Sequence, residues 1–209
     1  MDPTDPNQLA SLASLFQQTL NPEQRKPAED QIGQLQAQPR FGFLLLALVQ
    51  SESTSTAIRL ASAIQFKNLC KTRWNVDAET EDPVFSAISD DEKQAIRQQL
   101  VPVLVSLASA STPSQAILSQ MNESVALVAS SDFPEAWPAL IDELVSQLST
   151  DNHHVLLSVL ATSHAIFKQW RSQFRSDALY SEINLVLGKM ANPLLELLQR
   201  MHGMLLDPS

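Results

Sequence analysis

The chain has 209 residues, of which 44% are apolar and 18% charged, a composition typical of a folded protein with a substantial core. Four glycines are too few for a sheet-rich fold with many tight turns or for glycine loops around phosphates. The net charge of −9 disfavours nucleic acid as a partner, and a single cysteine excludes an intrachain disulfide.

Apolar residues three and four positions apart predict helices along most of the chain. The first four are expected at about 9–20, 22–38, 41–50 and 56–74, with Pro22 as the first residue of the second helix. In the fourth helix the apolar residues form two arcs, which predicts packing on more than one side. One arc holds Leu60, Ala61 and Ile64, and the other holds Ile58, Phe66, Leu69 and Cys70.

Five more helices are predicted after residue 88. The fifth begins with a capping-box pattern at Ser89–Glu92 and is expected to kink at Pro102. After the sixth, in the stretch SSDFPEAWPALIDELVSQL, Pro134 predicts a short extended segment and a seventh helix starting near Trp137. The eighth is expected to be capped near residue 151, and the ninth runs from about 179 with a bend at Pro193.

The helices form pairs whose first members begin near residues 8, 41, 92, 135 and 177. The average interval of about 42 residues is typical of HEAT-type helix pairs. The predicted fold is therefore an all-α HEAT-repeat α-solenoid of about four and a half repeats, and a compact helical bundle is the alternative.

Motifs for catalysis or metal binding are absent from the sequence, so we expect a binding protein without cofactor or metal and not an enzyme. His154 and His164 lie on different faces of one helix, a poor arrangement for a shared metal. Cys70 is expected to be an inert core residue. No apolar run approaches the roughly 20 residues of a membrane span, so no membrane insertion is expected.

Two segments allow two interpretations each. The acidic segment 75–91 is predicted to be a solvated loop leading into a helix, with an acidic docking site as the alternative. The segment from Phe167 to Arg175 alternates aromatic and basic residues. It is predicted to be an inter-helix corner, and base stacking on RNA is the alternative.

Three stretches resemble the karyopherin-β family of nuclear transport receptors, and the resemblance covers roughly residues 9 to 200. AIRLASAIQFKNLCKTRW is similar to the importin-β amino-terminal domain, which would occupy about 28–105, and SDFPEAWPAL is similar to a corner found across the family. HAIFKQWRSQFRSDALYSEINLVL, together with RFGFLLLALV, resembles the branch of exportins that returns importin-α to the cytoplasm.

The resemblance implies a receptor arch, residues 1–209, that holds the GTPase Ran in its GTP form on a concave face, cooperatively with importin-α cargo. It also implies movement between nucleus and cytoplasm and contact with FG-repeat nucleoporins. The alternative is a HEAT-repeat scaffold protein with no GTPase partner.

In such repeats the second helix of each pair lines the concave side, so polar residues there are predicted to contact Ran. The alternative is that they are solvated surface positions or, for Arg59 and Asn68, packing residues. The predicted contacts are Asp30, Gln34, Arg59, Lys67, Asn68, Lys71, Gln120 and Glu123.

The last helix carries a long apolar stripe that includes Val186, Met190 and Leu197. A solenoid needs polar caps at its ends. We therefore expect the chain to be the amino-terminal part of a longer receptor, and expect the 209-residue piece to self-associate through this helix.

Overall fold

The computed structural model describes residues 1–76 and 87–206, and over these residues the chain is helical without strands. The elements are α1 (Pro6–Thr19), α2 (Arg25–Gln36), α3 (Phe41–Gln50), α4 (Thr56–Arg73), α5 (Asp90–Ala108), α6 (Gln115–Asp132), α7 (Leu140–Ser146), α8 (His153–Gln169), the 3-10 turn η2 (Trp170–Ser172) and α9 (Asp177–Leu206).

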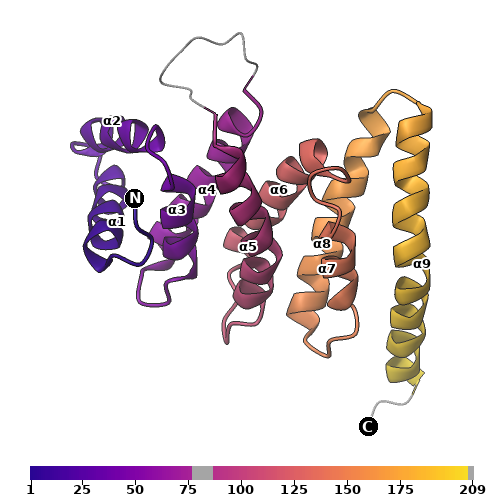
Figure 1. Ribbon diagram of the computed structural model, residues 1–209. Coiled ribbons are helices and arrows are strands. Elements are labelled where there is room, and N and C mark those ends of the chain that lie inside the picture. Colours follow the sequence, from indigo (N-terminus) through magenta and orange to yellow (C-terminus); the bar gives the residue numbers. More distant parts are fainter. Residues whose placement is uncertain (77–86, 207–209) are drawn as a thin grey trace.

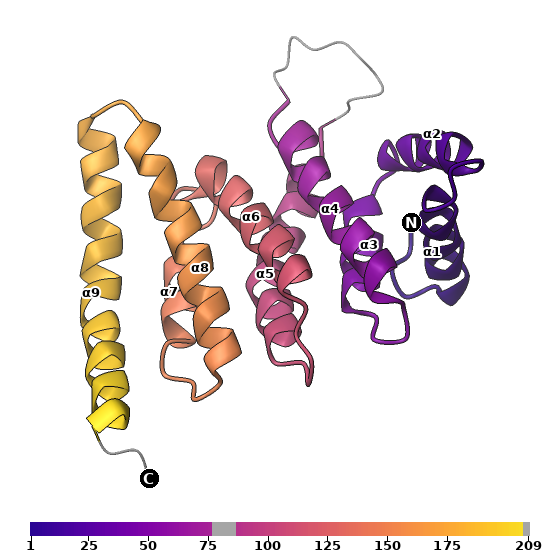
Figure 2. The same ribbon diagram turned by 180° about the vertical axis from the view of Figure 1, so that it is seen from behind.

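From α3 onward the helices stand in two rows (Figures 1 and 2). The first-helix row contains α3, α5, α7 and α9, each packed on the next, and the second-helix row contains α4, α6 and α8. Helix pairs stacked in this way, so that each touches only its neighbours, form an α-solenoid. The predicted solenoid is thus confirmed, and the compact bundle is excluded.

The first pair departs from this pattern. Helix α2 lies across the end of α1 and packs on α1 and α3 (Figure 1). It is α1 that packs on α4. The second helices α4, α6 and α8 thus form one row, and α2 lies apart from it; that this row is the concave side stays a prediction.

Two predicted helix starts are wrong, and proline explains both. Helix α2 begins at Arg25 because Asn21 and Pro22 form a turn, in which the Asn21 side chain accepts a hydrogen bond from the Glu23 amide (3.1 Å). Helix α7 begins at Leu140 and not near Trp137. Pro138 disfavours helical backbone at the residue before it, so the helix starts only after this proline.

Of the extended segment predicted at Pro134, only Phe133 is extended, and residues 133–136 form a turn. Phe133 has extended backbone angles, and the Phe133–Pro134 peptide bond is cis. The amides of Ala136 and Trp137 then both donate to the Asp132 carbonyl, at 2.7 and 2.8 Å. The corner is closed by the burial of Phe133 and Trp137, as the sequence predicted.

Most predicted apolar faces are buried, including Ile96, Leu100 and Leu104 of α5. The exception is one arc of α4, where Ile64 is 40% exposed and Leu60 is half-buried. Helix α4 still packs on both α3 and α6, but it does so partly through Ser62 and Ala63, whose small side chains allow close approach. The Ser62 hydroxyl is satisfied by donating to the Ile58 carbonyl (2.9 Å).

A buried polar cluster joins α6 to α8. The side-chain oxygen of Asn122 accepts hydrogen bonds from the hydroxyls of Ser158 (3.2 Å) and Thr162 (2.9 Å). All three residues are buried, so these bonds replace water that the groups lose on folding. The cluster gives the otherwise apolar α6–α8 contact a defined register.

Helix α9 packs on α7 as the first helix of a fifth pair. Arg200 donates to the carbonyls of Leu148 (2.9 Å), Ser149 (2.9 Å) and Thr150 (3.1 Å), just after the end of α7. Val186 and Met190 are buried. The opposite side of α9 is exposed, with large apolar side chains at Tyr180, Leu187, Leu195 and Leu198.

Both internal prolines lie within continuous helices, Pro102 in α5 and Pro193 in α9, and the bends expected there stay predictions. Helix α5 has the predicted cap, because the Ser89 hydroxyl accepts from the Glu92 amide (3.4 Å). The Glu92 side chain accepts instead from the amide of Arg40 (3.0 Å), which precedes α3 in a left-handed conformation.

Two segments, 75–91 and 167–175, allowed two interpretations each from the sequence, and the structure bears on only the second. Most of the acidic segment 75–91 lies outside the described residues. At the α8–α9 corner, Phe167 stacks on Trp170 with ring centres 4.8 Å apart, and the Trp170 indole donates to Glu182 (2.8 Å). This supports the corner interpretation for these two aromatics, whereas Phe174 is 89% exposed.

Among the described helices, none combines the length and apolar character needed to cross a membrane.

Candidate protein-binding surface

The exposed side of α4 carries one apolar residue beside polar ones. Ile64, Asn68 and Lys71 are all exposed and are spaced four and three residues apart, so they share one side of the helix. The sequence pointed to Asn68 and Lys71. It missed Ile64, which the helical wheel had assigned to a packed arc. Protein interfaces combine an apolar core with a polar rim, and Ile64 with the polar residues one and two turns after it supplies both kinds of side chain.

Lys67 of α4 and Glu123 of α6 form an ion pair between neighbouring helices of the row. The Lys67 Nζ lies 2.9 Å from the Glu123 Oε2, with the side chains 23% and 52% exposed. Both were predicted as separate contact residues. The structure brings them together, so neither charge points freely to a partner.

The side chains of Arg59 and Gln120 are partly buried against neighbouring residues of the chain. The Arg59 Nε donates to the Val49 carbonyl (2.8 Å) and so ties α4 to the end of α3, which agrees with the interpretation of Arg59 as a packing residue. The Gln120 Oε1 atom is buried and has no hydrogen-bond partner among the described residues. Neither side chain is presented as openly as Asn68 and Lys71.

Asp30 and Gln34 are exposed on α2. Because α2 packs on α1 and α3, these two residues do not belong to the row of α4, α6 and α8. A partner that contacts α2 as well as the row of α4, α6 and α8 would have to extend over both.

We call the exposed side chains of α4, α6 and α8 the second-helix face.

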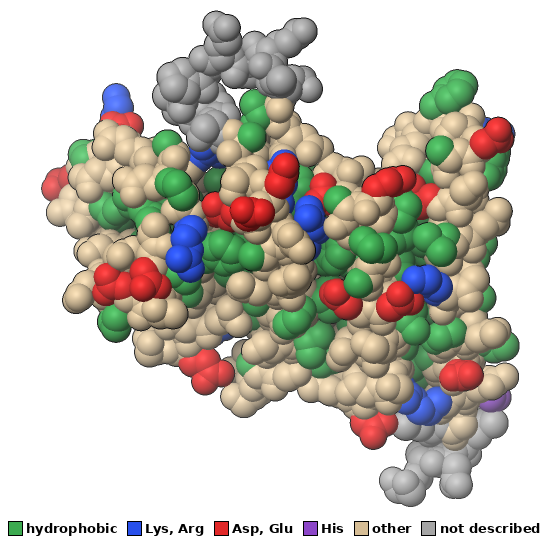
Figure 3. All heavy atoms as spheres, in the orientation of Figure 1, with side chains coloured by type: hydrophobic (Ala, Val, Ile, Leu, Met, Phe, Trp, Pro, Cys, Tyr) green, Lys and Arg blue, Asp and Glu red, His purple; other side chains and the backbone are tan. Residues whose placement is uncertain are grey.

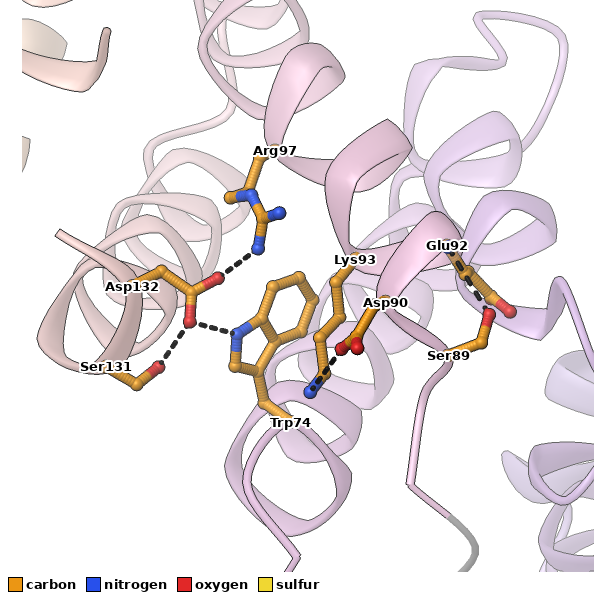
Figure 4. Close-up of polar contacts among 8 residues, drawn as sticks. All are labelled: Trp74, Ser89, Asp90, Glu92, Lys93, Arg97, Ser131 and Asp132. Carbon is orange, nitrogen blue, oxygen red and sulfur yellow. Dashed lines mark hydrogen bonds and ion pairs between the residues drawn. The ribbon is translucent and has the colours of Figure 1, made fainter. Parts of the chain in front are cut away.

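A buried polar cluster holds the ends of α4, α5 and α6 together (Figure 4). Asp132, the last residue of α6, forms an ion pair with Arg97 of α5 and accepts from the Trp74 indole Nε1 (3.0 Å) just after α4. The Ser131 hydroxyl also donates to Asp132 (3.0 Å), and the Lys93 Nζ lies 6.0 Å from the centre of the Trp74 ring. These bonds fix α4 and α6 relative to each other and thereby shape the second-helix face.

Two titratable groups beneath this face, Cys70 and Arg73, have pKa values shifted by burial. Burial raises the pKa of the Cys70 thiol, and the charge of Asp132 raises it further, so Cys70 is the unreactive core residue that was predicted. Burial also lowers the pKa of Arg73. Among the described residues no group of three potential metal ligands gathers.

Basic residues are in excess on the second-helix row, and acidic residues are in excess on the first-helix row. Helices α4, α6 and α8 carry five basic residues against two acidic ones; Arg73 and Asp132 are buried, which leaves four basic residues and Glu123 outside the core. Helices α5, α7 and α9 carry four basic residues against eight acidic ones, and acidic side chains are spread over the face that Figure 3 shows. On an acidic chain the second-helix face is thus electropositive, which suits an acidic protein surface.

Comparisons with known proteins identify two matching family models and several relatives. Residues 28–106 match the model of the importin-beta N-terminal domain, and residues 166–207 match that of Cse1. Exportin-2 of Drosophila melanogaster is 35% identical over 201 residues, which are 95% of this chain and 20% of the relative. The importin alpha re-exporter of Saccharomyces cerevisiae is 36% identical over 191 residues, 91% of this chain and 19% of the relative.

A solved structure described as the exportin Cse1 in its cargo-free, cytoplasmic state aligns with a TM-score of 0.79 at 34% identity, covering 91% of this chain and 20% of that one. This match confirms the predicted HEAT-repeat solenoid. The chain spans about a fifth of the length of these relatives. It belongs to the karyopherin-β family of importins and exportins, and within that family it resembles the amino-terminal part of exportin-2 and the importin-alpha re-exporters.

Proposed function

We propose that this chain is the amino-terminal arch of a nuclear export receptor that binds Ran-GTP and helps to carry importin-α from nucleus to cytoplasm. The observation that carries the proposal is the likeness, over at least 90% of the chain, to relatives named exportin-2 and importin alpha re-exporter. The chain would act by binding, without catalysis, as part of a longer receptor that shuttles through the nuclear pore.

The second-helix face is the proposed contact surface for Ran and the concave side of the arch. Its support is the exposed group of Ile64, Asn68 and Lys71 and the excess of basic residues on α4. An apolar centre with charged neighbours favours association with an oppositely charged protein surface, because charge steers the encounter and apolar burial adds affinity. Importin-α and FG-repeat nucleoporins are further proposed partners of the complete receptor.

Calorimetry with Ran loaded with GTP or GDP tests the proposal. We expect the GTP form to bind selectively. Substitution Lys71→Gln should weaken binding about twofold to fivefold, in the range of an exposed charge contact. Lys189→Gln on α9 removes a lysine from the other row and is the matched control.

Equal binding of both nucleotide forms would refute a Ran-GTP receptor. If neither form binds, the same measurement on a longer chain with importin-α separates an arch that is too short to hold Ran from a HEAT-repeat scaffold without a GTPase partner. Equal losses from Lys71→Gln and Lys189→Gln would refute the second-helix face as the contact surface.

A further inference from the structure

The Lys67–Glu123 ion pair lies within the proposed binding face. It joins two stacked helices at a distance of 2.9 Å and leaves more of Glu123 than of Lys67 exposed to solvent. An approaching partner therefore meets the Glu123 carboxylate, which covers part of the Lys67 amine.

Glu123 also differs in the sign of its charge from the other exposed charged residues of α4, α6 and α8. Helices α4 and α8 contain no acidic residue, and the other acidic residue of the row, Asp132, is buried against Arg97. Glu123 is thus the one exposed acidic side chain that the helices α4, α6 and α8 contribute. On a face that is otherwise suited to acidic partners, its carboxylate opposes their approach through like-charge repulsion.

We propose that Glu123 restrains partner binding by occupying Lys67 in the partner-free chain. An acidic side chain of a protein partner must displace the Glu123 carboxylate before it can pair with Lys67. The inference rests on the proposed function, because the acidic side chain is taken to belong to Ran-GTP. It assigns Glu123 a role opposite to the favourable contact predicted from the sequence.

The expected effect is moderate. An exposed ion pair contributes little to stability, so displacing it lowers the partner's affinity by about twofold to fivefold. Removing the charge of Glu123 should therefore strengthen binding by that factor. Because both side chains are partly exposed, salt should reduce the gain.

The substitution Glu123→Gln tests the inference, since glutamine keeps the shape of the side chain without its charge. Asp142→Asn is the matched control, because Asp142 pairs with Lys189 between two helices of the other row, at 2.7 Å and with exposures of 61% and 31%. Calorimetry with Ran-GTP at low and high salt should show tighter binding for Glu123→Gln and no change for Asp142→Asn.

A double-mutant cycle shows whether Lys67 mediates the effect. Lys67→Gln alone should weaken binding, and Glu123→Gln added to it should give a smaller gain than in the wild-type chain. If the wild-type chain binds Ran-GTP and Glu123→Gln binds equally or less tightly, the inference is overturned while the proposed function stands. If neither chain binds, the comparison of wild type with Glu123→Gln is repeated on the longer chain with importin-α, and absence of binding there overturns both.

Discussion

Replacing Asp132 with alanine should strongly destabilise the fold. The substitution leaves Arg97, whose side chain is only 13% exposed, without its ion-pair partner, and leaves the buried Trp74 indole without an acceptor. Breaking a buried pair from one side costs about 3–5 kcal/mol. Since Arg97 keeps some access to water, we expect the low end, about 3 kcal/mol. For a chain of this size that corresponds to a fall in Tm of roughly 6–12 °C.

Urea and thermal unfolding followed by circular dichroism measure this loss. Asp142→Ala, which breaks the exposed pair with Lys189, should cost at most about 1 kcal/mol. Replacing Asp132 by leucine together with Arg97 by methionine should cost less than Asp132→Ala, because no buried charge is left unpaired. A loss below about 1 kcal/mol for Asp132→Ala would refute the argument that this cluster holds three helices together.

Three further predictions concern other groups. Burial raises the pKa of Glu143, and a hydrogen bond from Trp137 partly opposes this. The folded chain therefore binds the proton more tightly than the unfolded chain, and stability from this group falls as pH rises through the raised pKa. Glu143→Gln should thus be more stable than wild type at pH 7, with the difference vanishing below about pH 4 in urea titrations; an unchanged difference would contradict this. Cys70 should react with a thiol reagent at least about 100-fold faster in urea than in the native state, and equal rates would show that it is accessible. Sedimentation should detect self-association of the 209-residue chain, abolished by Leu187→Glu with Leu198→Glu on the exposed side of α9; a monomeric wild-type chain would contradict it.

Local patterns in the sequence were enough to predict most of the fold. The apolar spacing of α5 and α6 and the cap at Ser89 determine these helices within their own residues, so the sequence predicts them well. The start of α7 differs from the predicted one because the apolar pattern begins at Trp137, whereas Pro138 disfavours helical backbone at that residue. The position of α2 across α1 depends on contacts between distant segments, which periodicity does not contain.

The candidate surface was predictable only in part. A helical wheel identifies which residues share a side of a helix, and it correctly placed Asn68 and Lys71 on exposed positions. It does not show which side faces a neighbour. Ile64 was therefore assigned to the core, and the pairing of Lys67 with Glu123, 56 residues apart, was not foreseen. Such contacts follow from how the repeats stack.

The hydrogen bonds of Asn122 have a consequence for how the arch can move. Apolar surfaces can slide over one another with little loss, because burial is not directional. Sliding of α6 past α8 would instead separate the Asn122 oxygen from the hydroxyls of Ser158 and Thr162. Thr162 would keep its bond to the Ser158 carbonyl, but the Asn122 oxygen and the Ser158 hydroxyl would be buried without these partners. The third and fourth repeats should therefore move as one rigid body, and any change in the curvature of the solenoid must come from its other joints.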